Sequence, residues 1–277
     1  MSAAKVIARL VLTWIALLAT QIAAGMLVHV HHPPMPHILP WLMLSDAIVA
    51  LALGPAALRS DWRNWKLGLA LFAIPAAIAT ANMIEGVLFL SNSHIDWRGT
   101  IQLTVLGYAV ASLLWLAVFR HAPVPEAAFA TPLPYRSFGQ QLGRFVFCIA
   151  CYVLLYFLAG TIIFPYVRDF YATQHIPDFG QIIALQFLLR GPVFVLLCLL
   201  LLRMFRLPRW SGALAVGLAF TLVSGVATLI IPNPFFPDSV RWVHFGEVTS
   251  SNFVFGVVVG WVWGHSLRVV HLATATA

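Results

Sequence analysis

The chain has 277 residues, of which 61% are hydrophobic and 9% are charged, and its formal net charge is +7. A water-soluble domain of ordinary composition carries about a quarter charged residues, so the composition argues against a soluble enzyme or binding domain. The basic residues are spread over several short segments, which excludes a compact basic module of the kind that binds nucleic acid.

Eight apolar stretches fill nearly all of the chain, and most charges lie between them. Each stretch has close to the ~20 residues that cross a hydrocarbon layer of ~30 Å. Backbone groups in a bilayer must bond within the segment, and the stretches lack the alternation of barrel strands, so each is expected to be a helix. The predicted fold class is an all-α polytopic integral membrane helix bundle with eight transmembrane helices: Val6–Val28, Leu39–Leu58, Leu67–Leu90, Thr100–Phe119, Leu142–Pro165, Ile182–Leu202, Ala213–Ile231 and His244–Gly264.

The first stretch also has features of a cleaved signal peptide. Lys5 and Arg9 precede its apolar run, and small residues surround Ala24. The run is longer than the apolar core of a usual signal peptide, so we favour a helix that stays in the chain.

The distribution of basic residues predicts the orientation. Only Arg98, Arg168 and Arg241 fall on one side of the eight-helix arrangement, and Arg190 lies within a helix. The others fall on the opposite side: Lys5, Arg9, Arg59, Arg63, Lys66, Arg120, Arg136, Arg144, Arg203, Arg206, Arg209 and Arg268. Cytoplasmic loops carry the excess of Lys and Arg, so we expect a plasma or inner membrane protein with both termini in the cytoplasm, its partners being the bilayer and its anionic head groups.

The chain contains a weak internal repeat. Arg9 and Arg144 are each followed, at the same spacing, by an Ala-Gly pair, at an offset of 135 residues. Later in each half the offset is 145 residues, where Trp65 matches Trp210 and Trp97 matches Trp242. Four helices per half would make this a parallel repeat. The expected division is a first half at 1–120, a Pro-rich cytoplasmic linker at 121–141 and a second half at 142–277.

Several polar residues lie inside the apolar stretches, near the predicted outer surface. A charge near the bilayer centre costs about 2.5–3.5 kcal/mol on insertion scales, so each needs a partner, water or a function. The candidates for binding a substrate or ion are Asp46, Asn82, Glu85, Gln186, Arg190, His244, Glu247 and Asn252. One interpretation is a water-filled cup open to the outside, with Arg190 at its floor. The other is a structural network in which an acidic residue neutralises Arg190 and locks helices together.

The repeat predicts which acidic residue approaches Arg190. When the two halves are aligned at the offset of 145 residues, Asp46 falls next to the position that matches Arg190. If equivalent helices face each other across a pseudo-axis, these two side chains come close. Pro192 follows Arg190 and removes one helical hydrogen bond, which predicts a break in the sixth helix.

Other motifs carry weaker signals. His29, His31, His32 and His37 crowd the first outer loop and are candidate metal ligands, although their spacing fits no standard zinc pattern. Cys148 and Cys151 form a C-x-x-C within one apolar helix, where packing is the favoured role. Gly256, Gly260 and Gly264 recur every four residues, which predicts close helix packing and allows a homodimer face.

Three classes of function are compatible with these patterns. The favoured one is a transporter or channel for a small solute or ion, which Arg190 would make selective for an anion. The second is a membrane-embedded enzyme acting on a lipid or peptide, with His244 and Glu247 as acid/base groups or metal ligands. The third is an accessory subunit without chemistry. The sequence contains no nucleotide-binding loop or haem-binding motif, so no cofactor is expected.

Overall fold

The computed structural model describes residues 2–28, 30, 37–90, 96–123, 137–174 and 176–264. In these parts the chain is helical and contains no strand. They contain eight helices that are long and apolar enough to cross a membrane, as predicted. We number these long apolar helices from first to eighth.

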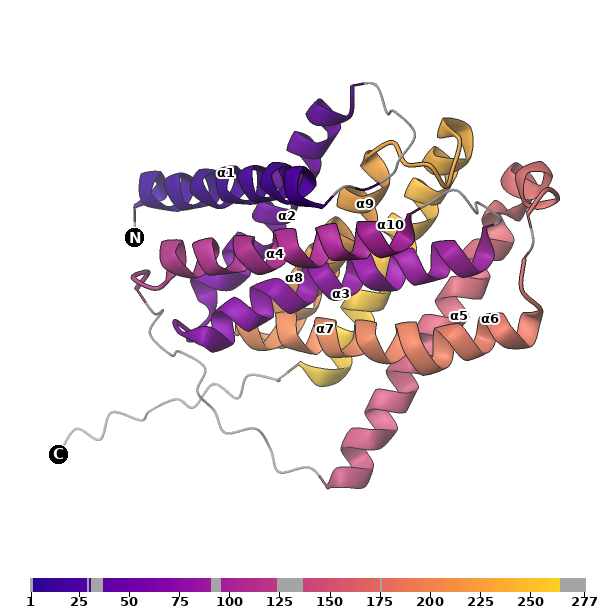
Figure 1. Ribbon diagram of the computed structural model, residues 1–277. Coiled ribbons are helices and arrows are strands. Elements are labelled where there is room, and N and C mark those ends of the chain that lie inside the picture. The colour runs from indigo at the N-terminus through magenta and orange to yellow at the C-terminus, as the bar shows by residue number, and fades with distance from the viewer. Residues whose placement is uncertain are drawn as a thin grey trace.

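The first four long helices are single α-helices: α1 (Ala3–Leu27), α2 (Ile38–Arg59), α3 (Trp65–Phe89) and α4 (Trp97–Phe119). The fifth is α5 (Phe138–Tyr171), whose 34 residues exceed the predicted stretch at both ends. It begins early because Ser137 and Gln140 form a capping box, which satisfies free backbone N–H groups in the polar flank. In Figure 1 the N-terminal end of α5 projects beyond the other helices.

The last three long helices comprise several segments. The sixth is built from α6 (Phe179–Leu185), the π-helical turn η1 (Gln186–Arg190) and α7 (Gly191–Phe205). The seventh is built from α8 (Arg209–Thr221), a second π-helical turn, η2 (Leu222–Val226), and α9 (Ala227–Ile230). The eighth is α10 (Asp238–Trp263).

The two π-helical turns change the course of the sixth and seventh helices. The Gly191 N–H bonds to the carbonyl of Gln186, five residues earlier, directly before Pro192. The break that Pro192 predicts is therefore present, and it takes the form of a widened turn rather than an interruption. In η2 the Ala227 N–H bonds to the carbonyl of Leu222, with no proline nearby. Such turns are rare and often occur at functional sites.

The glycine stripe of α10 packs within the chain. A methyl group on Gly256 would lie 2.7 Å from the Cα atom of Gly217 on α8, so the two backbones are in direct contact. Gly260 lies equally close to Ala213 of α8. The close packing predicted from this stripe is therefore made between α8 and α10. The homodimer face considered at Gly256, Gly260 and Gly264 remains a prediction, and the contacts of Gly256 and Gly260 with α8 are made within the same chain.

The first four and the last four long helices make several corresponding contacts, and we call these sets the first and the second group. In the first group α4 packs against α1 and α3, and α1 packs against α2. In the second group α10 packs against α8 and α5, and α5 packs against α7. Between the groups, α2 and α3 contact α7 and η2. A continuous apolar core fills the interior, with Trp115, Phe194, Phe220 and Phe255 fully buried.

One end of the bundle is dominated by arginines, and we call it the arginine end: Arg9, Arg59, Arg63, Arg144, Arg203, Arg206 and Arg209. The last carbonyls of a helix have no partner within the helix, and a cation there also interacts favourably with the helix dipole. Arg59 donates to the carbonyl of Phe205, the last residue of α7, at 3.0 Å. Arg209 donates to Trp261 near the end of α10 at 2.8 Å.

Candidate functional site

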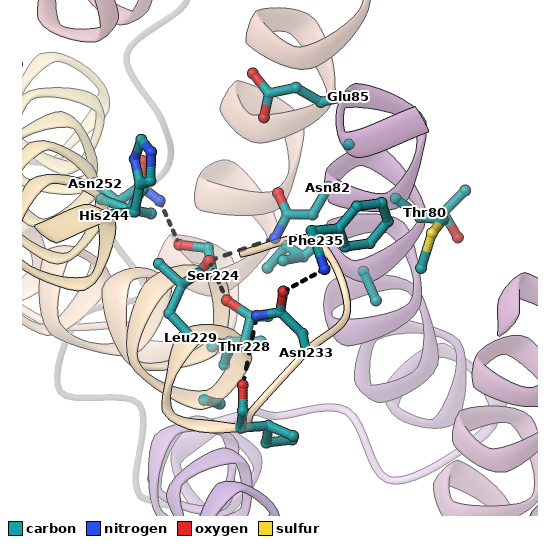
Figure 2. Close-up of a pocket in the computed structure, with 18 of the residues that line it drawn as sticks. Thr80, Asn82, Glu85, Ser224, Thr228, Leu229, Asn233, Phe235, His244 and Asn252 are labelled. Carbon is teal, nitrogen blue, oxygen red and sulfur yellow. Dashed lines mark hydrogen bonds between the residues drawn. The ribbon is translucent and has the colours of Figure 1, made fainter. Parts of the chain in front are cut away.

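A cavity of about 430 Å³ lies towards the other end of the bundle, and residues from all eight long helices line it (Figure 2). Its walls include Glu85, four residues before the end of α3, and His244, near the beginning of α10. Tyr171, the last residue of α5, also borders it. The cavity is within the size range of small-molecule sites and, like them, has a mostly apolar wall with a few convergent polar groups.

The structure brings together all eight candidate residues predicted from the sequence. Seven border the cavity: Asp46, Asn82, Glu85, Arg190, His244, Glu247 and Asn252. The eighth, Gln186, is fully buried and donates to Glu85 Oε1 at 2.8 Å. They come from four of the long helices, so only the tertiary structure could join them.

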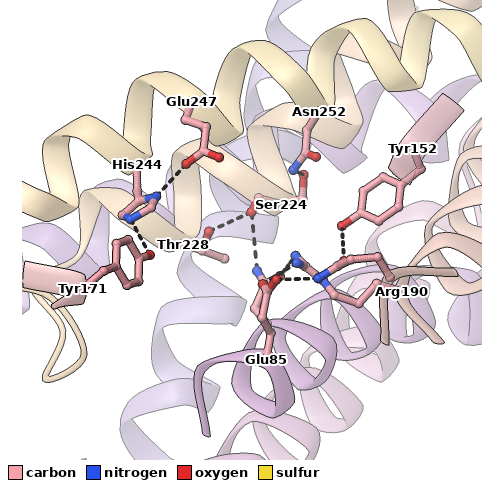
Figure 3. Close-up of polar contacts among 11 residues, drawn as sticks. Glu85, Tyr152, Tyr171, Arg190, Ser224, Thr228, His244, Glu247 and Asn252 are labelled. Atoms are coloured by element: carbon pink, nitrogen blue, oxygen red, sulfur yellow. Dashed lines mark hydrogen bonds and ion pairs between the residues drawn. The ribbon is translucent and has the colours of Figure 1, made fainter. Parts of the chain in front are cut away.

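Arg190 is the centre of one polar network (Figure 3). Its Nη1 atom forms an ion pair with Glu85 Oε2, and its Nη2 atom donates to Asn82 Oδ1 at 2.9 Å. The guanidinium also lies over the ring of Phe194, 5.0 Å from its centroid. Gln186 is held in turn by the Tyr152 hydroxyl, which donates to its Oε1 atom at 3.2 Å. Both oxygens of Glu85 are therefore occupied, and the arginine is neutralised.

The ion pair predicted between Asp46 and Arg190 is not formed. Asp46 borders the same cavity, is 2% exposed, and its Oδ2 atom has no hydrogen-bond partner in the described part of the chain. The superposition of halves assumed regular helices, whereas the π turn η1 inserts one extra residue into the turn that carries Arg190. Arg190 consequently pairs with α3 rather than with α2.

His244 is the centre of a second network, also drawn in Figure 3. Its Nδ1 atom lies 2.6 Å from Glu247 Oε2, and its Nε2 atom lies 2.8 Å from the Tyr171 hydroxyl. If Nδ1 carries the proton, it donates to Glu247 while Nε2 accepts from Tyr171, which suits a neutral imidazole. A carboxylate that orients a histidine beside a hydroxyl is an arrangement capable of proton transfer.

Ser224, in the π turn η2, is hydrogen-bonded to side chains of both α3 and α10. Asn252 Nδ2 donates to Ser224 Oγ at 2.8 Å, and Asn82 Nδ2 donates to the Ser224 carbonyl at 3.5 Å (Figure 2). Thr228 donates to the same carbonyl at 2.9 Å. This residue was missed by sequence reasoning, because nothing in the local sequence indicates that η2 widens and presents a carbonyl to side chains. Tyr152 and Tyr171 were missed too, although a phenol inside an apolar helix is itself a signal of a buried polar partner.

The connection between α9 and α10 forms part of the cavity wall. Asn233 Oδ1 accepts from the backbone N–H groups of Phe235 and Phe236 at 3.0 and 3.2 Å, which fixes a tight turn. The Phe235 ring lies against Gly86 of α3, where a methyl group would stand 3.0 Å from it. The Phe236 ring lies 4.8 Å from the ring of His244. The two aromatic rings therefore reach from this connection to α3 and to the His244 network.

Arg241 holds this connection in place. It is buried and donates to the carbonyls of Leu229 and Ile230 at 2.8 and 3.0 Å, at the end of α9. It also forms an ion pair with Asp238 at 2.9 Å. Sequence reasoning used Arg241 only to assign orientation, whereas its position at a helix end gives it a structural role.

The C-x-x-C motif does not border the cavity, and most histidines of the first outer loop lie outside the described residues. His29, His31 and His32 lie outside the described residues, and His37 precedes α2. Within the residues that the structure describes, no group of three or more His, Cys, Asp or Glu side chains could hold a metal ion. Cys148 and Cys198 are buried free thiols in the helix interior, which agrees with a packing role.

The chain matches no protein-family model, no curated protein and no solved structure. Its function must therefore be argued from its own residues.

Proposed function

We propose that this chain is a multi-pass membrane transporter that binds a small polar solute in the cavity between two related four-helix halves. The observation that carries the proposal is the cavity itself, since intramembrane ionisable groups from separate helices border one space at the junction of the halves. A solute site near the interface between repeats is the usual arrangement in transporters of this kind.

The division into halves at 1–120 and 142–277 is supported by a pair of matching contacts. Arg9 of α1 donates to the carbonyl of Val118 near the end of α4 at 3.3 Å. Arg144 of α5 donates to the carbonyl of Val262 near the end of α10 at 3.2 Å. The first and fourth helices of each half are thus joined in the same way, by the two arginines that the sequence repeat aligns.

The arginine end supports a transporter that is closed on one side. Asp61, in the connection after α2, bonds to both Nη atoms of Arg203 at 3.1 Å and lies 3.4 Å from Arg206. These contacts join the first half to the second at the end away from the cavity. By the bias of basic residues, this end faces the cytoplasm and the cavity faces outwards, in a plasma or inner membrane.

The charges around the cavity change the expected solute. Arg190 would attract an anion only if its charge were free, and Glu85 already neutralises it. We therefore propose a small polar solute, without a preference for an anion. Glu247 and His244 are candidates for carrying a coupling proton, because they border the cavity and are bonded to each other.

A membrane-embedded enzyme is the second candidate, and the Tyr171–His244–Glu247 chain is the observation that favours it. These groups could act as general acid and base on a lipid or peptide. Replacing Glu247 by Gln would abolish such chemistry because the imidazole would lose its carboxylate partner. Turnover of a lipid by the wild type, lost in this variant, would favour the enzyme.

Transport can be tested without knowing the solute, through a single cysteine in the cavity. Ser251, which borders the cavity, is replaced by Cys in a background with Cys148, Cys151 and Cys198 replaced by Ala. The protein is reconstituted into vesicles, and a membrane-impermeant thiol reagent is added on either side. A transporter that alternates its access gives reaction from both sides. Reaction from one side alone indicates a static pocket, and the cysteine-free background gives the blank.

A further inference from the structure

Acidic groups outnumber basic groups among the described residues that border the cavity. Among the described residues, three carboxylates border it, from Asp46, Glu85 and Glu247, and one guanidinium, that of Arg190. The Arg190–Glu85 pair cancels, and His244 adds no charge in the neutral form in which Nδ1 donates to Glu247 and Nε2 accepts from Tyr171. Two acidic side chains therefore remain without a cationic partner, one from each half. A low-dielectric space lined by such groups favours a positively charged solute.

Both remaining carboxylates have an oxygen free to receive a donor. Asp46 is only 2% exposed, and among the described residues nothing bonds to its Oδ2 atom. Glu247 uses Oε2 for His244, and no described side chain donates to its Oε1 atom, which lies on the side of Gly160 in α5. A buried carboxylate oxygen without a donor, such as Asp46 Oδ2, is costly, and the free oxygen of Glu247 is a second acceptor, so an arriving cationic N–H group has a place to bind at each residue.

The rest of the wall suits an organic cation better than a metal ion. A hard metal ion takes about six or more oxygen ligands and favours several carboxylates, and the described residues contain no group of three or more His, Cys, Asp or Glu side chains that could hold one. Aromatic side chains border the same space: Phe89, Tyr108, Tyr156, Phe235 and Phe236. Aromatic faces attract cations and also cover an apolar body.

We infer that the solute of this cavity is a small organic ammonium ion, whose N–H groups bind the free carboxylate oxygens of Asp46 and Glu247. This inference rests on the proposed function and names the class of solute. Asp46 contributes from the first half and Glu247 from the second, so a bound ammonium would join the two halves at the cavity.

The inference is tested by binding to the full chain in nanodiscs of zwitterionic lipid, with three probes of similar shape. 2-Phenylethylammonium is the cation, 2-phenylethanol the neutral analogue and phenylacetate the anion. Saturable stabilisation is read from the unfolding temperature. We expect the ammonium to stabilise the protein and the other two probes to give no saturable shift. Asp46→Asn and Glu247→Gln should each weaken ammonium binding about tenfold or more, because each removes a charge-assisted contact.

Asp169→Asn is the matched control, since Asp169 is exposed and does not border the cavity. It should bind the ammonium as the wild type does. Loss in one carboxylate variant alone would overturn the two-carboxylate site, because the bound ammonium would then need no bond to the other residue. Equal shifts with all three probes, a preference for phenylacetate, unchanged binding in both carboxylate variants, or the same stabilisation by sodium alone would each overturn it.

This outcome is separable from that of the transport test. Ammonium binding with cysteine reaction from one side alone would leave the solute class intact and remove transport. Reaction from both sides without any ammonium preference would leave transport intact and remove the solute class.

Discussion

The two ends of the bundle use charged residues in different ways. At the arginine end, guanidinium groups bind backbone carbonyls at helix ends, and Asp61 is the acidic partner of Arg203 and Arg206. At the cavity end, charged groups lie within helices and bond mainly to other side chains, as Arg190 does to Glu85. Polar groups that bond to backbone hold a fold together, whereas polar groups that converge on a space can also bind a solute.

Buried polar atoms without a partner among the described residues occur at both ends, Trp263 Nε1 at the arginine end among them, but those that belong to charged side chains lie at the cavity end. Arg63 donates to six carbonyls, those of Ala57, Leu58, Ser60, Trp62, Ala122 and Pro123. At the cavity end, Asp46 Oδ2 and Arg190 Nε are buried without a partner in the described part of the chain. Buried polar atoms are nearly always bonded in native proteins, so such exceptions point to a functional site.

The largest expected effect comes from breaking the buried pair at the cavity end. Arg190→Leu leaves Glu85 without its cation and should lower the free energy of unfolding by about 3–5 kcal/mol. Adding Glu85→Gln to this variant should recover much of the loss, because no unpaired charge remains. Arg203→Leu at the arginine end, where the side chain is half exposed, should cost no more than about 1 kcal/mol. Unfolding in detergent micelles measures all three, and equal losses for the two single variants would refute the contrast.

An intermediate effect is expected from Arg63. Arg63→Met removes the donor for several carbonyls after α2 and should cost about 1–3 kcal/mol of stability. Ammonium binding at the cavity should be unchanged once the variant is folded, because Arg63 lies at the other end. Thermal unfolding and the nanodisc binding assay measure the two quantities. A change in ammonium affinity would show that the ends are coupled, against the contrast drawn above.

The smallest effect is expected from Asp61→Asn, about 0.5–1 kcal/mol at neutral pH. Partial burial alone would raise the pKa of Asp61, but the hydrogen bond and charge of Arg203 and the charge of Arg206 outweigh it and hold the pKa below the ordinary 3.8. A lowered folded-state pKa gives stability that is present above 3.8 and is lost as the pH falls through the folded-state value. The difference between wild type and variant should therefore shrink in acid. A difference that grows in acid would contradict this sign.

Much of the site could be predicted from the sequence, because the depth of a side chain in the membrane depends on its position along its own helix. Glu85 and His244 interrupt apolar stretches near one predicted surface, so their convergence on one end was expected. The connection that carries Asn233 and Phe235 was not foreseen as a cavity wall, because its path depends on contacts with Gly86 and Arg241 rather than on its own residues.

The sequence by itself determined the eight long apolar helices and the level at which each polar side chain lies along them, because both follow from residue type over about 20 consecutive positions. Only the tertiary structure decided the pairings: Arg190 with Glu85 in place of Asp46, and Gly256 of α10 against Gly217 of α8. The physical reason is that a pairing depends on how each helix is rotated about its axis. Packing and the π-helical turns set that rotation, and hydrophobicity along the chain does not encode it.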